Sequence, residues 1–311
     1  EKGIHGAILS YLSLKKENFY MVENTVDGKF FVTARGWEDL SEILKSYEEL
    51  QVEIGEKLIG EFLQKEEIAR DFAGYYRLYE KYKSDYQIQE ILDGNVISGQ
   101  LKTCCDMGKK ASFEERFTVT EMLLEAVTER ISVFQKTDEK IEKLYENLKL
   151  LKIFLQEKNS VEAMEQFVAS RRKALDAKIC SELLTAEEAA REEEQIRILE
   201  EYFFQLKELH ISDVAEGIEQ IGERFGNVCR LRNEKLKETK KMLEQAFSFL
   251  EECFGEGQEL LLFETGLTGD DRCSIFISQY GCPSYFKHCE LLLYSKKENE
   301  LRKECRDLLE E

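Results

Sequence analysis

A single proline, Pro283, occurs among the 311 residues of this chain. Proline removes a backbone donor and breaks helix interiors, so its near absence favours long uninterrupted helices. Charged residues make up 34% of the chain and aromatic residues 11%, a composition typical of solvated amphipathic helices around a buried core. We therefore expect a mainly all-α fold with a little strand near the start.

The phosphate-binding motif Gly-x-x-x-x-Gly-Lys-Ser/Thr is absent from the sequence. Without it, no segment is expected to cradle the α- and β-phosphates of a nucleotide or to hold Mg²⁺ in the Walker manner. The three histidines, His5, His210 and His288, lie near no Ser, Cys or Asp that suggests a catalytic pair. The sequence therefore shows no complete active site, and this chain is not expected to hydrolyse ATP alone.

Acidic residues outnumber basic ones, with 63 Asp+Glu against 44 Lys+Arg, so the net charge is −19. Residues 1–98 carry 12 Lys+Arg and 19 Asp+Glu, a net of −7, and the remainder carries the other −12. An acidic chain repels nucleic acid and anionic membrane surfaces. There is no apolar run of 18 residues, so we expect no membrane insertion.

The nine cysteines are an odd number and include no Cys-x-x-Cys pair. This pattern favours reduced thiols in a cytoplasmic protein. The adjacent Cys104 and Cys105 are interpreted as incidental. One alternative is a zinc site, although the spacing fits no metal module, formed by Cys273, Cys282, His288 and Cys289.

The first part of the chain predicts a small helical domain over residues 1–98. Residues 19–33 alternate as expected for a hairpin that turns at Asp27-Gly28, and three helical patterns follow up to Tyr86. The aromatic stripe of Ile68–Tyr82 is interpreted as packing surface, because no Lys/Arg interleaving suggests base stacking. Glycines in the following segment indicate a linker over residues 99–112.

Residues 113–311 predict a helical bundle extension. Capping boxes at Ser112, Thr185 and Ser295 mark helix starts, and Asp270 or Asp271 is expected to cap another. Narrow apolar seams of coiled-coil type predict antiparallel neighbours within the chain, with an intermolecular coiled coil as the alternative. Their members are Ile141, Leu144, Leu148, Leu151 and Leu155, then Val214, Ile218, Ile221, Phe225 and Val228, then Leu243, Phe247, Leu250 and Phe254. After Phe254 we expect short helices folded back on the bundle.

The stretch from Phe30 to Ser41 places two adjacent residues that are unfavourable in the first turn of a helix. Thr33 is placed as the N-cap of a helix, which puts Arg35 and Gly36 in the first turn. A cation there opposes the helix dipole, and glycine costs about 1 kcal/mol relative to alanine. Because such unfavourable residues cluster at functional sites, Arg35 is a candidate anion contact. The alternative is a surface arginine paired with Glu38 or Asp39.

This stretch, Thr33-Ala-Arg-Gly-Trp-Glu-Asp-Leu-Ser41, resembles the lid region of bacterial MoxR-type AAA+ ATPases. The resemblance extends to Phe72–Tyr82 and Ile91–Gly94 and covers the first third of the chain. It implies that Arg35 is the sensor 2 arginine, a catalytic and ATP-binding residue that reaches the γ-phosphate of ATP in the same subunit. Thr33, at the same helix start, is the second ATP-binding candidate.

The resemblance also implies what the whole protein does. It would bind ATP and Mg²⁺, hydrolyse ATP as a homo-oligomeric ring, and remodel or assemble partner proteins in a chaperone-like way. Such partners often contain von Willebrand A domains. This chain would be a carboxy-terminal part of that protein, the lid plus a helical extension. The alternative function is a non-catalytic helical scaffold that binds other proteins.

Overall fold

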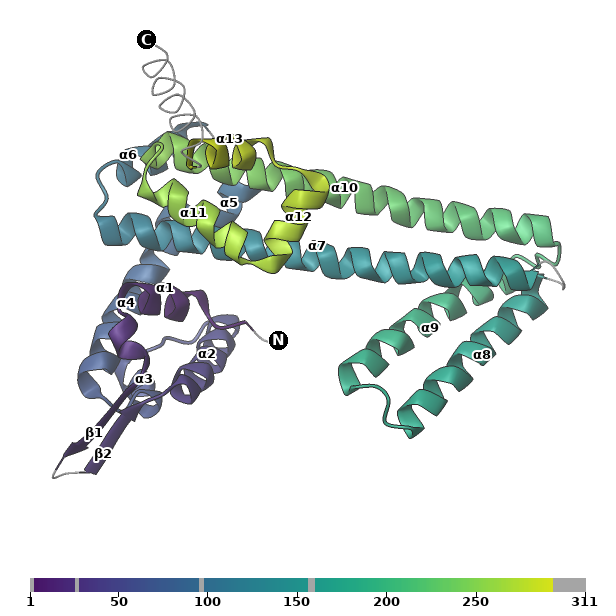
Figure 1. The fold of residues 1–311 in the computed structure, drawn as a ribbon, viewed down its shortest axis with the longest axis horizontal. Helices are drawn as coiled ribbons and strands as arrows, with labels where there is room; N and C mark the ends of the chain where they lie inside the picture. Colours follow the sequence, from purple (N-terminus) through teal and green to yellow (C-terminus); the bar gives the residue numbers. More distant parts are fainter. Residues whose placement is uncertain (1–2, 26–27, 95–97, 156–159, 293–311) are drawn as a thin grey trace, which may run out of the picture. The chain divides into compact units, whose positions relative to one another are not determined.

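The computed structural model describes residues 3–25, 28–94, 98–155 and 160–292 (Figure 1). Within these ranges the chain is α-helical apart from one two-stranded antiparallel hairpin, which confirms the predicted fold class. It divides into two compact units. Unit 1 comprises residues 1–131 and 240–311, and unit 2 comprises residues 132–239. No helix of the described ranges is both long and apolar enough to cross a membrane.

Unit 1 begins with a short helix, a 3₁₀ turn, the hairpin and a set of further helices. In chain order these are α1 (Gly6–Leu14), the turn Lys16–Phe19, β1 (Met21–Thr25), β2 (Gly28–Val32), α2 (Ala34–Glu49), α3 (Glu56–Phe62), α4 (Glu66–Tyr86), α5 (Ile88–Asp93) and α6 (Ser98–Gly108). The hairpin pairs Met21 with Val32 and Thr25 with Gly28. The predicted hairpin is therefore confirmed, although its turn residues 26–27 lie outside the described ranges.

The core of this first part is an aromatic cluster centred on Phe72 of α4. The ring of Phe72 lies edge-on to Tyr11 at 5.2 Å and to Trp37 at 5.3 Å between centroids. Tyr75, one helical turn along, hydrogen-bonds Ser10 at 2.6 Å and Thr118 at 3.1 Å. The predicted packing role of the aromatic stripe is confirmed, and the hydroxyls of Tyr75, Tyr76 and Tyr79 form hydrogen bonds within unit 1.

Two long helices pass from one unit into the other. They are α7 (Phe113–Leu155) and α10 (Val214–Phe254), and α11 (Gln258–Gly269), α12 (Asp271–Tyr280) and α13 (Pro283–Leu292) follow within unit 1. These three confirm the short helices expected after Phe254. Asp270 caps α12 by accepting from the backbone N–H groups of Arg272 and Cys273.

Unit 2 contains the carboxy-terminal part of α7 and the amino-terminal part of α10, with the helices α8 (Ser160–Cys180) and α9 (Ala186–Glu208) between them in the chain. Thr185 forms the predicted capping box with Glu188 at the start of α9. The unit has its own apolar core, whose most buried members are Leu151, Leu155, Met164, Phe167, Leu175, Leu199, Tyr202 and Leu206. The seam on α7 is thus buried within the chain, as the intrachain interpretation predicts.

The helix start at Ser112 is also confirmed, since its hydroxyl accepts from the N–H of Glu115 at 3.2 Å. The box at Ser295 lies outside the described residues.

The division of the chain differs from the predicted boundaries 1–98, 99–112 and 113–311. Residues 98–108 form helix α6 instead of an irregular linker, and both ends of the predicted extension belong to unit 1. The sequence does not reveal the observed boundaries because they fall inside the long helices α7 and α10. Neither helix carries a glycine or proline where one unit ends and the other begins.

The expectation of reduced thiols also needs correction. Cys105 of α6 and Cys253 of α10 form a disulfide across 148 residues of sequence. Spacing along the chain gives no sign of a pair so far apart.

Candidate functional site

The start of α2 has the local structure that the sequence predicts. Thr33 is extended (φ −136°, ψ 160°), and its hydroxyl oxygen accepts a hydrogen bond from the N–H of Gly36 at 3.2 Å. One of the first-turn N–H groups is thereby satisfied by a side chain. Arg35 is the second residue of the helix, so the predicted position in the first turn is confirmed.

The helix behind Arg35 is firmly anchored. Trp37 is 2% exposed, and Leu40 and Leu44 are fully buried. The indole N–H of Trp37 donates to the carbonyl oxygen of Phe19 at 3.2 Å, which ties α2 to the turn before the hairpin. These contacts fix the direction in which the helix start points within unit 1.

Gly36 has a packing reason that the sequence does not reveal. A Cβ atom at this position would lie 2.7 Å from the carbonyl oxygen of Phe62, the last residue of α3. Real Cβ atoms almost never approach an oxygen so closely, so glycine is what lets α2 and α3 meet here. The glycine in the first turn of α2 therefore has a structural cause. The cation in the same turn, Arg35, is not explained by this contact.

The Arg35 side chain is 79% exposed. Its Nε donates to Oδ2 of Asp39 at 3.1 Å, and its Nη2 lies 3.0 Å from Oδ1 of the same carboxylate. This is a two-point surface ion pair between residues four apart on α2, and it corresponds to the alternative interpretation of Arg35. It also shows a guanidinium presented to an oxyanion at the positive end of a helix.

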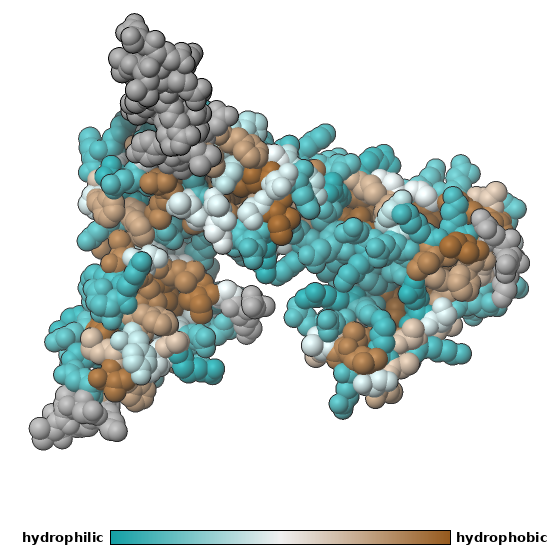
Figure 2. Space-filling model, viewed as in Figure 1, coloured by the Kyte–Doolittle hydropathy of each residue, from teal (hydrophilic) through white to brown (hydrophobic). Residues whose placement is uncertain are grey.

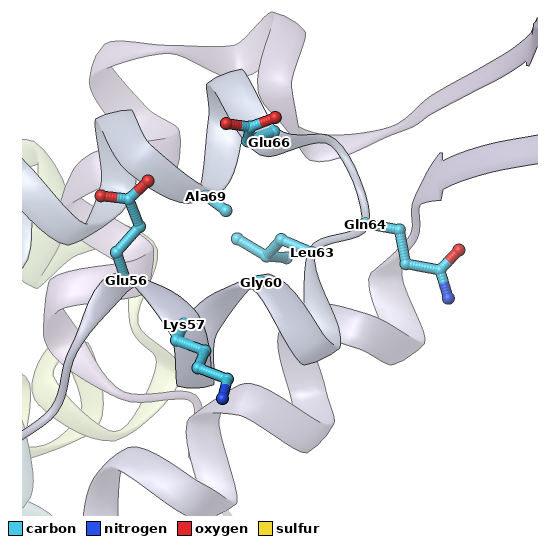
Figure 3. A pocket seen from close by; sticks show the side chains of 7 residues that line it. All are labelled: Glu56, Lys57, Gly60, Leu63, Gln64, Glu66 and Ala69. Carbon is cyan, nitrogen blue, oxygen red and sulfur yellow. The ribbon is translucent and has the colours of Figure 1, made fainter. Parts of the chain in front are cut away.

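A pocket of about 420 Å³ lies where α3 meets α4 (Figure 3). Neither Thr33 nor Arg35 is among the residues that line it. The side chains of Leu63 and Ala69 point into it, whereas Lys57 and Gln64 point away. The carboxylates at its edge, Glu56 and Glu66, both pair with Arg70. Because the two carboxylates at its edge are already paired and its centre is aliphatic, the pocket offers little to fix a polar ligand.

A polar network around Glu48 is the feature that sequence reasoning missed. His5 caps α1, since its Nδ1 accepts from the N–H of Ala7 at 3.1 Å, and its Nε2 lies 2.9 Å from Oε1 of Glu48. An accepting Nδ1 requires the neutral tautomer with the proton on Nε2, which then donates to Glu48. The partner is 43 residues away, so proximity in sequence could not reveal it.

Two more donors converge on the same carboxylate. The hydroxyl of Tyr76 donates to Oε1 at 3.1 Å, and Nζ of Lys83 donates to Oε2 at 3.2 Å. Burial alone would raise the pKa of Glu48, but the hydrogen bonds from His5 and Lys83 and the positive charge of Lys83 outweigh it and lower that pKa. Glu48 is therefore a firmly ionised structural carboxylate.

Glu125 of α7 contrasts with Glu48, because its pKa is raised instead of lowered. Its carboxylate accepts a hydrogen bond from the hydroxyl of Tyr79 at 3.1 Å. Burial raises the pKa of Glu125, and repulsion from Glu129 adds to this, although His5, Tyr79 and Lys83 act against it. Burial likewise raises the pKa of Tyr79. Both carboxylates are held by hydrogen bonds from neighbouring side chains, Glu48 by His5, Tyr76 and Lys83 and Glu125 by Tyr79, so we assign them to the stability of unit 1.

The described residues hold no group of three or more His, Cys, Asp or Glu side chains that could bind a metal ion. Three of the four residues of the zinc alternative bond to other side chains. Cys273 hydrogen-bonds Thr128, Cys282 hydrogen-bonds Glu244, and His288 bonds Glu251.

Comparisons with known proteins add nothing to these observations. No protein-family model matches the chain, and neither a curated protein nor a solved structure matches it.

Proposed function

We propose that this chain is the lid and helical extension of a MoxR-type AAA+ ATPase. In this proposal Arg35 contacts the γ-phosphate of ATP bound to the same subunit, and the chain itself carries no phosphate loop. The sequence resemblance at Thr33–Ser41 supports the family, and the structure at the start of α2 supports the role of Arg35.

The observation that carries the proposal is the state of the Arg35 guanidinium. It is exposed, it lies in the first turn of an anchored helix, and it already binds a carboxylate through two nitrogen atoms. Exposed ion pairs contribute only about 0–1 kcal/mol. Exchange of Asp39 for a phosphate oxygen therefore costs little, and the helix end adds its own partial positive charge toward the anion.

The rigid support of α2 fits the same role. Sensing requires that motion of the arginine be transmitted to the rest of the domain, which a loosely packed helix would not do. The hydrogen bond from Trp37 to Phe19 joins α2 to the turn before the hairpin. The close approach of Gly36 to Phe62 joins α2 to α3. A displacement of Arg35 toward a phosphate would then move α2 and α3 together.

Thr33 has a supporting role in this arrangement. Its hydroxyl oxygen accepts from the N–H of Gly36, so its main task is to hold the helix start. The hydroxyl proton is still able to donate to an anion at the same place.

For the whole protein, the proposal includes ATP and Mg²⁺ as ligands, a homo-oligomeric ring, and remodelling of partner proteins, of which von Willebrand A domain proteins are one class. Unit 2 would be the part that meets partners. Its exposed large apolar side chains include Tyr145, Ile153, Ile179, Leu183, Phe204, Leu209 and Leu231. Figure 2 shows hydrophobic surface over parts of this unit.

The same exposed side chains favour the second candidate function, a helical scaffold that binds proteins without catalysis. The two functions make opposite predictions for the natural protein upstream of Glu1. The ATPase proposal requires a phosphate loop and a Walker B acidic residue in the preceding 300 or so residues, the length of about one to two domains. A natural sequence without either would contradict it and leave the scaffold.

A further inference from the structure

We infer that Cys105 and Cys253 are a reversible oxidation site that controls whether helix α6 stays docked on the end of α10. The inference is independent of the proposed ATPase function. It rests on where the disulfide lies and on how little apolar surface the described part of α6 buries.

The disulfide lies in a small contact between two helix faces. Cys105 and Gly108 are three residues apart on α6, so they share one face. They meet Cys253 and Phe254, the last two residues of α10. A Cβ atom at Gly108 would lie 2.8 Å from the Phe254 ring, so the two helices are close at this point. The bond therefore fastens α6 to α10 at their shared contact.

Little apolar surface supports this contact. Among the side chains of α6 that the structure describes, the buried positions are Cys104, Cys105 and Gly108, while Leu101 and Met107 are only half-buried. A helix of 11 residues is marginal by itself in water, and two cysteines and a glycine bury far less apolar surface than a set of leucines. Once the covalent bond is broken, we expect α6 to leave α10 readily.

The neighbouring Cys104 explains why Cys105 is the residue that pairs. The Cys104 thiol faces the end of α4, where it lies 3.8 Å from the carbonyl oxygen of Asp85 and 3.9 Å from that of Tyr86. Burial raises the pKa of this thiol, which keeps it protonated and a poor nucleophile. The two adjacent cysteines thus point to different partners, and only one of them meets a second cysteine.

The chemistry is ordinary thiol–disulfide exchange. A dithiol reductant attacks one sulfur, forms a mixed disulfide, and leaves as a cyclic disulfide, so that Cys105 and Cys253 each end as a thiol. In the other direction, a low-molecular-weight disulfide takes up the two electrons and the two protons of both thiols. It is released as two thiol molecules, and the protein disulfide forms.

Trypsin cleavage of the full chain provides the test, because Lys102, Lys109 and Lys110 on and just after α6 are exposed. The chain is treated with oxidised glutathione or with a dithiol, digested briefly, quenched, and fully reduced before mass analysis. In the oxidised chain these sites should be protected. Reduction should speed cleavage there by about tenfold or more, which corresponds to about 1.4 kcal/mol of lost docking.

Cys105→Ser and Cys104→Ser form the matched pair of variants, since the residues are adjacent, both buried and similar in size. Cys105→Ser should be cleaved rapidly in both buffers, whereas Cys104→Ser should respond to the reductant as the natural chain does. Alkylation of the unfolded natural chain gives a measurement that needs no variant. After oxidation, positions 105 and 253 should be the two that resist alkylation. Equal cleavage of the natural chain in both buffers, or full alkylation of both positions after oxidation, would overturn the inference.

Discussion

Replacement of Glu48 by Gln tests the polar network that joins α1, α2 and α4. The carboxylate receives hydrogen bonds from His5, Tyr76 and Lys83, and its pKa is lowered from 4.5 to about 2. A carboxylate with a lowered pKa stabilises the folded state above its ordinary pKa, and that contribution is lost as the pH falls from about 4.5 to about 2. Glutamine keeps an acceptor oxygen but has no charge.

The expected loss of folding stability in Glu48→Gln follows from the lowered pKa of Glu48. A change of one pKa unit is worth about 1.4 kcal/mol, so the shift sets an upper value of about 3 kcal/mol at pH 7. The expected loss is smaller, about 1–2 kcal/mol, because the side chain of Glu48 is 26% exposed and the capping tautomer of His5 is uncharged. For a unit of this size, each kcal/mol lowers the Tm by roughly 2–4 °C.

The assay is urea unfolding followed by the fluorescence of Trp37, the single tryptophan of the chain, which is buried in the same part of unit 1. Glu49→Gln is the matched control, because it removes the same charge from the exposed neighbouring position. At pH 7 Glu48→Gln should be clearly less stable than the natural chain and Glu49→Gln should not. The difference should shrink by pH 3. Equal stability of the two variants at pH 7 would refute the role assigned to the network.

Further substitutions test the packing and the second carboxylate. Gly36→Ala should destabilise unit 1 by about 1–3 kcal/mol, because its methyl group would meet the Phe62 carbonyl oxygen, whereas Gly74→Ala in open space on α4 should stabilise by about 0.5–1 kcal/mol. Equal effects in thermal unfolding would show that α2 and α3 do not meet as described. Glu125→Gln should raise stability at pH 8 more than at pH 5, because burial raises the pKa of Glu125 and its charged form opposes folding as the pH rises. A pH-independent loss of stability in that variant would contradict this.

Local signals in the sequence predicted the elements well. The caps at Thr33, Ser112, Thr185 and Asp270 are all observed, because a side chain and a backbone group three residues apart decide each of them. The hairpin and the all-helical remainder follow from periodicity in the same way. Features that depend on residues far apart in the chain were not predictable by these means.

Three cases show this limit. His5 caps α1 and binds Glu48 43 residues away, although the residues near it in the sequence suggested no partner. Gly36 breaks helix propensity because of a backbone atom in another helix. Cys105 pairs with a cysteine 148 residues away, inside a segment that glycine content indicated as a linker. Of the candidate site, the position and capping of Arg35 were predictable, and its ion pair with Asp39 was one of two alternatives left open.

The most direct test of the proposed function is ATP turnover in the longer protein that the proposal requires, measured at saturating ATP. Arg70→Ala is the matched control for Arg35→Ala, since both arginines are exposed and paired with carboxylates in unit 1. If Arg35 contacts the γ-phosphate, its replacement should lower turnover by about 10²–10³-fold with little change in Tm, and Arg70→Ala should keep turnover near that of the natural protein. Turnover of Arg35→Ala equal to that of Arg70→Ala would contradict the proposal.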